Sequence, residues 1–253
     1  DISILKNLKI YGVGIVELGV QSMDDAVLKL CNRGQSSEDV VIATRLLKEF
    51  GFSVGVQMMI GLPCDSEEKA LNTAKELIAL KPDIARIYPA LVIKNTYMEE
   101  MYLSGEYQPL SLNSAVELSK RLLILFEGNG INVIRIGLQP TENISSGRDV
   151  VAGPFHPSIR HLVESLLYRD MAAYLLEKAE VKQSIITLKV NPKNISEMVG
   201  YKRSNIDFVK SKFFIDKLEI FQDESVEAGT IMLISNNICM NMSKKDYYSI
   251  ATK

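Results

Sequence analysis

The sequence predicts an α/β protein, built as part of a (βα) barrel or an open sheet, followed by a small α+β domain. Two observations lead to this fold class. A unit that runs from an amphipathic helix through a glycine or proline into an apolar strand returns four times, at residues 5–22, 46–63, 77–92 and 123–140. From about Lys182 that pattern stops, and short strands and helices follow in a different order. Repeated helix–strand units are typical of a parallel sheet with helices packed on it.

Three helices are predicted from apolar residues that recur three and four positions apart. The first spans about residues 37–50, with Ser36 or Ser37 to cap its beginning and Gly51 to end it. The second follows Asp65 and Glu68, which form a pair that resembles a capping box, and stops at residues 81–82. The third spans about residues 113–126 and ends at one of the two glycines that follow.

The predicted strands are nearly continuous runs of Val, Ile, Met and Leu, a pattern typical of strands covered on both faces. Ligands of such folds gather at the carboxyl ends of the strands. Polar residues stand at those ends: Gln21 and Ser22, then Gln57 just before Gly-Leu-Pro, and 139–141 as Gln-Pro-Thr. A single glutamine there is equally explained as a strand end that meets water, but the recurrence favours a ligand site.

Composition excludes several function classes. Formal net charge is −2, with 47% hydrophobic and 24% charged residues, so the chain is an ordinary globular protein and not a wholesale nucleic-acid or membrane binder. No apolar run reaches the roughly 18 residues of a membrane span. The cysteines Cys31, Cys64 and Cys239 lie too far apart in sequence for a disulfide framework or a zinc ribbon. This spacing fits a protein of the reducing cytoplasm, where disulfides are rare. With only two histidines, a conventional hydrolase is poorly supplied.

The stretch VELGVQSMDDAVLKLCNRGQSSEDVVIATRLLKEFGFSVGVQMMIGLP, at 16–63, resembles the middle of radical S-adenosylmethionine (radical SAM) enzymes. The most similar groups are the Elongator catalytic subunit and the oxygen-independent coproporphyrinogen oxidase, whose strands end in GVQS or GVQD and in GLP around an NRG or NRE. A second stretch, at 137–165, resembles the segment after the barrel in the Elongator-like branch. The resemblance covers about residues 11–171, and it implies a partial barrel of the radical SAM type.

The resemblance also implies roles for single residues. Gln21 would lie near the ribose or methionine part of S-adenosylmethionine, and Arg33 would pair with the methionine carboxylate. Gln57 matches a position that often holds aspartate in the family, and it would contact the ribose. The backbone that includes Met59 and Gly61 would border the adenine. The alternative interpretation of Arg33 is a solvated residue at a helix end.

Radical chemistry needs a CxxxCxxC run that holds a [4Fe–4S] cluster, and this sequence has none. We therefore expect the chain as given to lack the first half of the barrel and, alone, neither to assemble the cluster nor to cleave S-adenosylmethionine. Cys31 and Cys64 are better interpreted as small buried hydrophobic residues.

The motif AGPFHPSIR contains His156, with Arg148 and Arg160 nearby. A structural role, in which this loop is held over the barrel, is the favoured interpretation of His156. We name all three residues as substrate-side candidates.

The order strand–helix–helix–strand–strand after residue 182 resembles the KH domain, whose Gly-x-x-Gly loop grips a nucleic-acid backbone. Gly200, Tyr201, Lys202 and Arg203 would occupy that loop as RNA-binding candidates, with Ile206 as the apolar anchor. Arg203 replaces the second glycine of the usual loop. The alternative is a plain α+β domain with a solvated Lys-Arg turn.

We thus expect three parts: a partial barrel at 1–142, a segment at 143–180 that packs on it, and a KH-like domain at 181–253. The leading hypothesis is the carboxyl-terminal part of a cytoplasmic iron–sulfur enzyme that uses S-adenosylmethionine, with a flavodoxin or ferredoxin as reductant, no membrane, and RNA, above all tRNA, as its substrate. The alternative is a noncatalytic RNA-binding or scaffold protein on a degenerate partial barrel.

Overall fold

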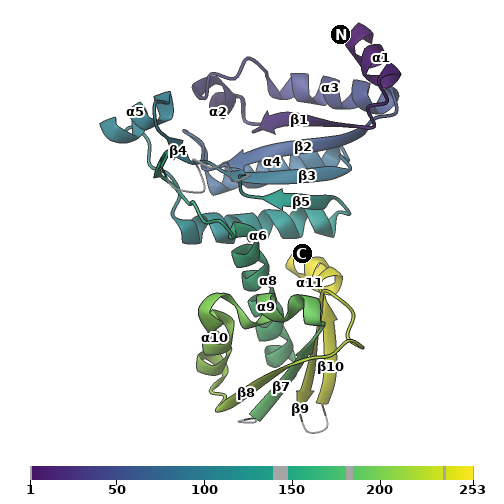
Figure 1. Cartoon of the computed structure of the whole chain (residues 1–253), viewed down its shortest axis with the longest axis vertical. Coiled ribbons are helices and arrows are strands. Elements are labelled where there is room, and N and C mark those ends of the chain that lie inside the picture. The colour runs from purple at the N-terminus through teal and green to yellow at the C-terminus, as the bar shows by residue number, and fades with distance from the viewer. Residues whose placement is uncertain (1, 139–147, 181–184, 236–237, 253) are drawn as a thin grey trace. The chain divides into compact units, whose positions relative to one another are not determined.

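The computed structural model describes residues 2–138, 148–180, 185–235 and 238–252. They form two compact units, Asp1–Pro157 and Ser158–Lys253 (Figure 1). The expected strand end at 139–141 falls outside the described residues. None of the helices in the described ranges is long and apolar enough to cross a membrane.

The first unit contains a parallel sheet of four strands in the order β1-β2-β3-β5 (Figure 1). Its strands are β1 (Ile15–Gln21), β2 (Ser53–Ile60), β3 (Ile84–Pro89) and β5 (Asn132–Ile136), which confirms the predicted α/β class. The helices of this unit are α1 (Ile2–Ile10), α2 (Asp25–Leu30), α3 (Ser37–Glu49), α4 (Glu67–Ala79), α5 (Tyr97–Ser104) and α6 (Leu112–Gly128). A short antiparallel pair, β4 (Val92–Ile93) with β6 (Val150–Ala152), follows β3.

Serine side chains cap the three long helices of this unit. Ser36 and Asp39 form a reciprocal capping box at the beginning of α3, and Ser111 caps α6. At α4 the capping side chain is Ser66, which accepts from the backbone N–H of Lys69. The prediction that Asp65 and Glu68 open this helix was therefore wrong by one residue. The Asp65 carboxylate instead accepts from the N–H groups of Gly61 and Ser66.

Helices α3, α4 and α6 pack on one face of the sheet, and Figure 1 shows α4 behind the strands. On β3 this produces a strict alternation of buried and half-buried residues. The prediction that both faces are covered was wrong, because the second face carries polar side chains and remains accessible. Its members include Glu17, Gln57 and Arg86. Such a one-sided sheet is the geometry of a barrel wall, whose inner face lines a lumen.

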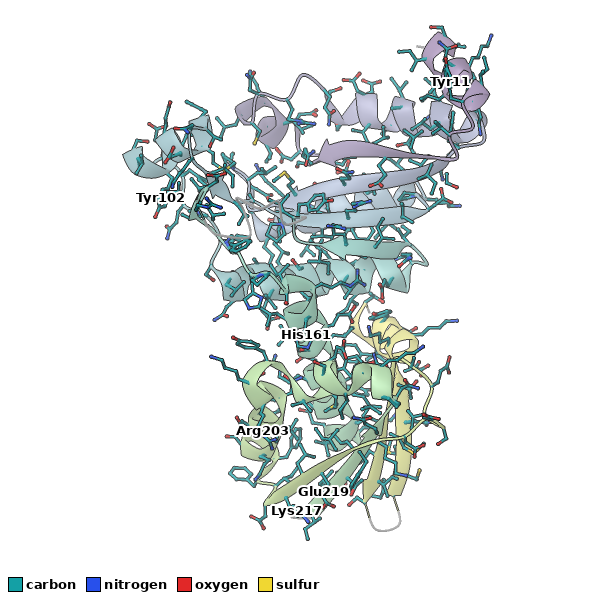
Figure 2. The ribbon with its side chains drawn as sticks, in the orientation of Figure 1. Tyr11, Tyr102, His161, Arg203, Lys217 and Glu219 are labelled. Atoms are coloured by element: carbon teal, nitrogen blue, oxygen red, sulfur yellow. The ribbon has the colours of Figure 1, made fainter. Side chains whose placement is uncertain are left out.

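The second unit packs helices on one face of a mixed sheet in the order β10-β9-β7-β8, with β7 parallel to β8. Its strands are β7 (Ile185–Val190), β8 (Lys217–Gln222), β9 (Thr230–Ser235) and β10 (Ile238–Ser243). Its helices are α8 (Ile159–Lys178), α9 (Ile195–Val199), α10 (Ser204–Phe213) and α11 (Lys244–Ala251), with short 3₁₀ turns at Pro192–Asn194 and Tyr201–Arg203. The expected order strand–helix–helix–strand–strand is present, and β10 and α11 extend it. On β8, Lys217 pairs with Glu219 on the same side of the strand (Figure 2).

The boundary between the units differs from the expected one. Helix α8 lies in the second unit, where it packs against α9, α10, β9 and β10. Its buried residues include Val163, Leu167, Met171 and Leu175, which recur every four positions, as expected for a stripe that faces the core. The segment expected to span 143–180 is thus divided at residue 157, and α8 supplies much of the core of the second unit.

Asn205 fixes the turn between α9 and α10. Its side-chain amide, 2% exposed, donates to the carbonyls of Ser165 and Glu197 at 2.7 and 2.9 Å. At Gly200 the φ angle is +78°, and a Cβ atom there would lie 2.7 Å from the Asn205 side chain. Only glycine can occupy this position without displacing Asn205.

The turn that follows has an unusual backbone. Lys202 and Arg203 both adopt left-handed conformations, with φ angles of 50° and 68°. Arg203 lies at the beginning of α10 (Figure 2). A left-handed conformation costs a residue with a Cβ atom about 1–2 kcal/mol, whereas glycine adopts it freely. The position where the KH loop has its second glycine therefore has a glycine-like backbone here, although arginine occupies it.

Replacing Arg203 with glycine should raise the free energy of unfolding of the second unit by about 0.5–1 kcal/mol. Relief of the left-handed strain exceeds the added entropy of the unfolded chain. Urea titration followed by circular dichroism measures the change. Lys210→Gly, within the right-handed helix α10, is the control and should lower that free energy by about 1 kcal/mol. Equal destabilisation by both variants would contradict the strained turn.

Candidate functional site

The turn after β1 is held by side chains from α4. Thr73, buried in α4, accepts from the backbone N–H of Met23 at 3.0 Å and lies 3.4 Å from the Ser22 hydroxyl. Ser22 in turn accepts from the N–H of Asp24, whose carboxylate caps α2. Ser22 and Asp24 thus both have partners that close the turn. The strand must end here, and its last residue, Gln21, is presented at the edge of the sheet.

Gln21 itself has a left-handed backbone, with φ of 66°, and the register of β1 against β2 shifts between Leu18 and Gln21. Such bulges redirect side chains and occur often beside functional sites. A Cβ atom at Gly19 would lie 3.1 Å from the Gln21 amide nitrogen and 3.6 Å from the Arg33 guanidinium. Glycine at 19 therefore gives both polar groups the space that they occupy.

Arg33 lies over the end of β1. Its guanidinium donates to the carbonyl of Gly19 at 3.1 Å, and the Gln35 amide donates to the carbonyls of Gly19 and Val20 at 3.0 and 3.1 Å. Side chains from the loop after α2 therefore help to satisfy the carbonyls of Gly19 and Val20, and the Val20 carbonyl also accepts from the backbone N–H of Ser22. Arg33 is exposed yet anchored, with the rest of its guanidinium available to a ligand carboxylate.

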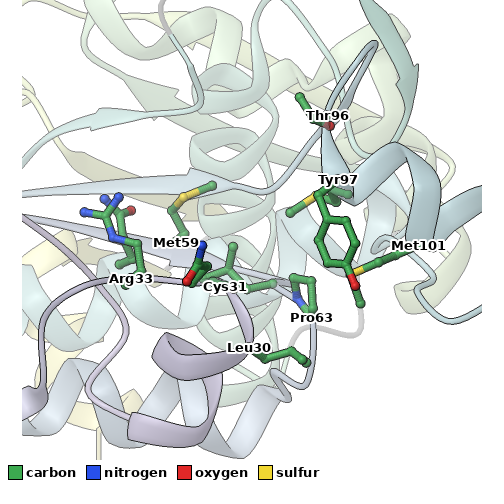
Figure 3. A pocket seen from close by; sticks show the side chains of 12 residues that line it. Leu30, Cys31, Arg33, Met59, Pro63, Thr96, Tyr97 and Met101 are labelled. Carbon is green, nitrogen blue, oxygen red and sulfur yellow. The ribbon is translucent and has the colours of Figure 1, made fainter.

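A cavity of about 650 Å³ opens at this edge of the sheet. Gln21, Arg33 and Met59 all line it, from three separate segments of the sequence. In Figure 3 Arg33 and Met59 lie at one end, and Tyr97 and Met101 lie at the other. The lining is completed by Leu30, Cys31, Asn32, Leu62, Pro63, Thr96 and Met98. The lining is largely apolar, and Arg33 places a charged group at one end.

The Gly-Leu-Pro turn forms one wall of this cavity through Leu62 and Pro63, while Gly61 lies behind them. Gly61 has φ of +73°, and a Cβ atom there would lie 2.7 Å from the Leu110 side chain. The Tyr107 hydroxyl donates to the Gly61 carbonyl at 2.5 Å, and the Gly61 N–H donates to the Asp65 carboxylate. Burial raises the pKa of the Asp65 carboxyl and raises that of Tyr107 to about 12. Gly61 thus supports the cavity from behind and does not line it.

Gln57 is not among the cavity-lining residues. It lies on the accessible face of the sheet, where its amide nitrogen donates to Oε2 of Glu17 at 3.0 Å. The Arg86 guanidinium holds the same carboxylate at both oxygens, with N–O distances of 2.5 and 2.7 Å. Hydrogen bonds from Arg86 lower the pKa of the Glu17 carboxyl, which therefore stays ionised. This pair stabilises the fold above the ordinary pKa of a glutamate, and the contribution is lost as the pH falls through the lowered value.

Sequence reasoning missed the wall formed by α5. Thr96, Tyr97, Met98 and Met101 line the cavity from this helix and its cap. Their pattern is that of any short amphipathic helix, so no signal in the sequence marked them. Cys31 also lines the cavity, and burial raises the pKa of its thiol. Cys64 was predicted to be buried and is exposed, at a residue with a left-handed backbone.

The substrate-side candidates are divided between the two units. Arg148 and His156 lie in the first unit, and Arg160 lies in the second, where it pairs with Glu164 at 3.3 Å. None of the three lines the cavity. Of the loop residues 200–203, Tyr201 is 49% exposed, and the Lys202 ammonium lies 5.3 Å from the centre of its ring. Across the described ranges, no group of three His, Cys, Asp or Glu residues could hold a metal ion.

Two family models match the chain: the radical SAM superfamily at residues 1–77 and the radical SAM C-terminal domain at residues 82–169. Among curated relatives, the tRNA uridine(34) acetyltransferase of Methanocaldococcus infernus is 43% identical over 110 residues, which are 42% of this chain and 21% of that protein. Elongator complex protein 3 of Homo sapiens is 36% identical over 124 residues, 48% of this chain and 23% of that protein.

A solved structure of Methanocaldococcus infernus Elp3 with residues 1–46 deleted is also similar, with a TM-score of 0.57 and 27% identity. The alignment covers 91% of this chain and 48% of that one. The chain therefore matches only about a fifth of the length of these curated relatives and about half of the solved structure. Residues 1–77, which match the radical SAM superfamily model, contain the motifs GVQS, NRG and GLP in this order. The chain belongs to the radical SAM superfamily, and its relatives are of the Elongator-like group.

Proposed function

We propose that this chain is part of an iron–sulfur enzyme that binds S-adenosylmethionine in the 650 Å³ cavity at the carboxyl ends of its strands. The observation that carries the proposal is the convergence of Gln21, Arg33 and Met59 on one cavity. An anchored guanidinium suits a carboxylate, an amide suits a polar ligand, and a thioether with apolar neighbours suits a planar base. These are the chemical parts of S-adenosylmethionine.

Residues of this chain fit that cofactor, but its cysteines do not fit the cluster. Cys31, Cys64 and Cys239 lack the CxxxCxxC spacing. We therefore assign the [4Fe–4S] cluster to protein sequence other than these 253 residues. With a cluster present, reductive cleavage of bound S-adenosylmethionine would supply a 5′-deoxyadenosyl radical, and a flavodoxin or ferredoxin would supply the electron. Alone, the chain would be inactive.

We propose tRNA as the substrate class. The support is the similarity to tRNA uridine(34) acetyltransferases, together with the exposed basic turn of the second unit. Lys202 and Arg203 would contact phosphate, beside Gly200 and Tyr201 in a KH-like loop. Arg148, His156 and Arg160 stay candidates for the substrate side. Free cysteines at three separate positions favour a reducing, cytoplasmic compartment.

The test uses the full-length encoded protein, reconstituted without oxygen. We expect about four irons and four sulfides per chain, and 5′-deoxyadenosine on reduction in the presence of S-adenosylmethionine. Arg33→Ala should raise the Kd for S-adenosylmethionine roughly tenfold or more, because one charged hydrogen-bond partner is lost. Arg45→Ala, on the exposed side of α3, is the matched control and should leave that Kd unchanged. Absence of both iron and cleavage in the full-length protein would overturn the proposal.

A second candidate function is RNA binding without radical chemistry, which the basic Gly200–Arg203 turn favours. Exchanging both Lys202 and Arg203 for alanine should weaken tRNA binding. It should also reduce the slope of log K against log salt concentration by about one to two. Filter binding over a series of salt concentrations measures both quantities. The control Lys178→Ala/Lys245→Ala removes the same charge from exposed positions of the same unit. An affinity equal to the wild type's would exclude this loop as the RNA contact.

A further inference from the structure

Helix α10 and the residues at its two ends combine aromatic and basic side chains. Residues 201–214 include four aromatic residues, although aromatic residues make up only 7% of the chain. The same segment has four cations and a single carboxylate, Asp207, within a chain whose net charge is −2. Rings interleaved with cations are typical of surfaces that bind single-stranded nucleic acid, because bases stack on the rings and cations hold the phosphates.

Cations from α8 and α10 lie over these rings. The two helices pack against each other in the second unit (Figure 1). The Arg169 guanidinium lies 4.5 Å from the ring centre of Phe208. The Lys212 ammonium lies 5.8 Å from that centre and 5.5 Å from the ring centre of Phe213. We define the α10 surface as these side chains and their neighbours on the helix: Arg169, Phe208, Lys210, Lys212, Phe213 and Phe214.

The two cations that lie over rings are held by accessible ion pairs. Lys212 pairs with Glu177 at 2.8 Å, and the two side chains are 43% and 55% exposed. Arg169 pairs with Asp170 at 3.0 Å. Ion pairs as exposed as that of Lys212 contribute little to stability, because water and salt compete for both charges. A phosphate can therefore replace the carboxylate at Lys212 at little cost to the fold.

Phe214 lies where a phenylalanine lowers the stability of the fold. It is 90% exposed, more than any other large hydrophobic residue in the described ranges. It ends α10 with a left-handed backbone, φ 54°, at a position that glycine or asparagine usually occupies. The ring gains no burial, and the Cβ atom adds strain. A residue that stabilises neither the helix end nor the core indicates a contact with another molecule.

We propose that the α10 surface binds an unpaired segment of RNA, with bases stacked on Phe213 and Phe214 and phosphates held by the neighbouring lysines. The inference rests on the proposed function, which takes tRNA as the substrate class, and adds that the part bound at this surface is single-stranded. Duplex RNA offers phosphates but keeps its base faces stacked, so it cannot use the rings. The ten residues of α10 span about 15 Å, which separates Phe214 from the Gly200–Arg203 turn at the other end of the helix.

The test measures RNA binding to the full-length protein by fluorescence anisotropy. The probes are a labelled oligouridine of about twelve nucleotides and an RNA duplex of the same length. Phe214→Ala should raise the Kd for the single strand roughly tenfold, the effect of one lost base stack, and change the Kd for the duplex by less than about twofold. Phe214→Trp keeps an aromatic ring and should bind as the wild type does. Phe221→Ala removes a half-exposed ring from β8 and is the matched control.

Phe214→Gly separates stacking from folding. Glycine relieves the left-handed strain, so this variant should melt at a higher temperature than the wild type while it binds the single strand roughly tenfold more weakly. A purely structural ring would instead lower the melting temperature when removed. Exchanging both Lys210 and Lys212 for alanine should reduce the slope of log K against log salt concentration by about 0.7 for each phosphate contact that is lost. Lys193→Ala/Lys245→Ala is the charge control and should leave the slope unchanged.

The outcomes separate this inference from the proposed function. If the wild type binds the single strand and Phe214→Ala binds it equally well, the stacking role is overturned, and a protein partner becomes the better explanation of the exposed ring. An equal loss for both probes would show that the surface reads charge and not unpaired bases, which also overturns the inference. If the wild type binds neither probe nor tRNA, RNA is the wrong substrate class, and this inference fails with it. Iron content and cleavage of S-adenosylmethionine do not depend on Phe214, so they test the radical chemistry separately.

Discussion

The ion pair between Glu17 and Arg86 is the interaction on which the accessible face of the sheet depends. It joins β1 to β3 across β2. Gly55 on β2 has no side chain and so leaves room for the Glu17 side chain. Charged groups on the inner side of a barrel wall are stable only if each is paired and hydrogen-bonded. Here one carboxylate accepts from both Arg86 and Gln57. The face is thereby polar without being unsatisfied, and it can border a polar ligand.

Polar groups at the strand ends are also paired within the protein. At the bulge in β1, Arg33 donates to the carbonyl of Gly19, and Gln35 donates to the carbonyls of Gly19 and Val20. A residue that completes the backbone hydrogen bonding of the turn is thus also the residue that would recognise a carboxylate. The site is therefore held by bonds that exist before any ligand arrives, which is how a binding geometry is made rigid.

Local patterns in the sequence predicted the parallel α/β class and a cap for α3 at Ser36 or Ser37, and both follow from periodicity and capping chemistry. The expectation that Gln21, Arg33 and Met59 serve one ligand came from the family resemblance. The one-sided burial of the sheet was not predicted, because apolar strands such as β2 look alike whether one or both faces are covered. The role of α5 and the partner of Gln57 depend on which segments meet in space, and the register of three strands sets that meeting.

The division at residue 157 could not be predicted from local patterns either. The apolar stripe of α8 shows that this helix packs against a core, but not which of the two units supplies that core.

The claim that S-adenosylmethionine occupies the edge defined by Gln21, Arg33 and the Gly-Leu-Pro turn is tested most directly by hydrogen–deuterium exchange. The measurement compares the cluster-loaded full-length protein with and without the cofactor. We expect slowed exchange confined to residues 19–34, 57–63 and the beginning of α5. Slowed exchange elsewhere in the protein, with these segments unchanged, would contradict it.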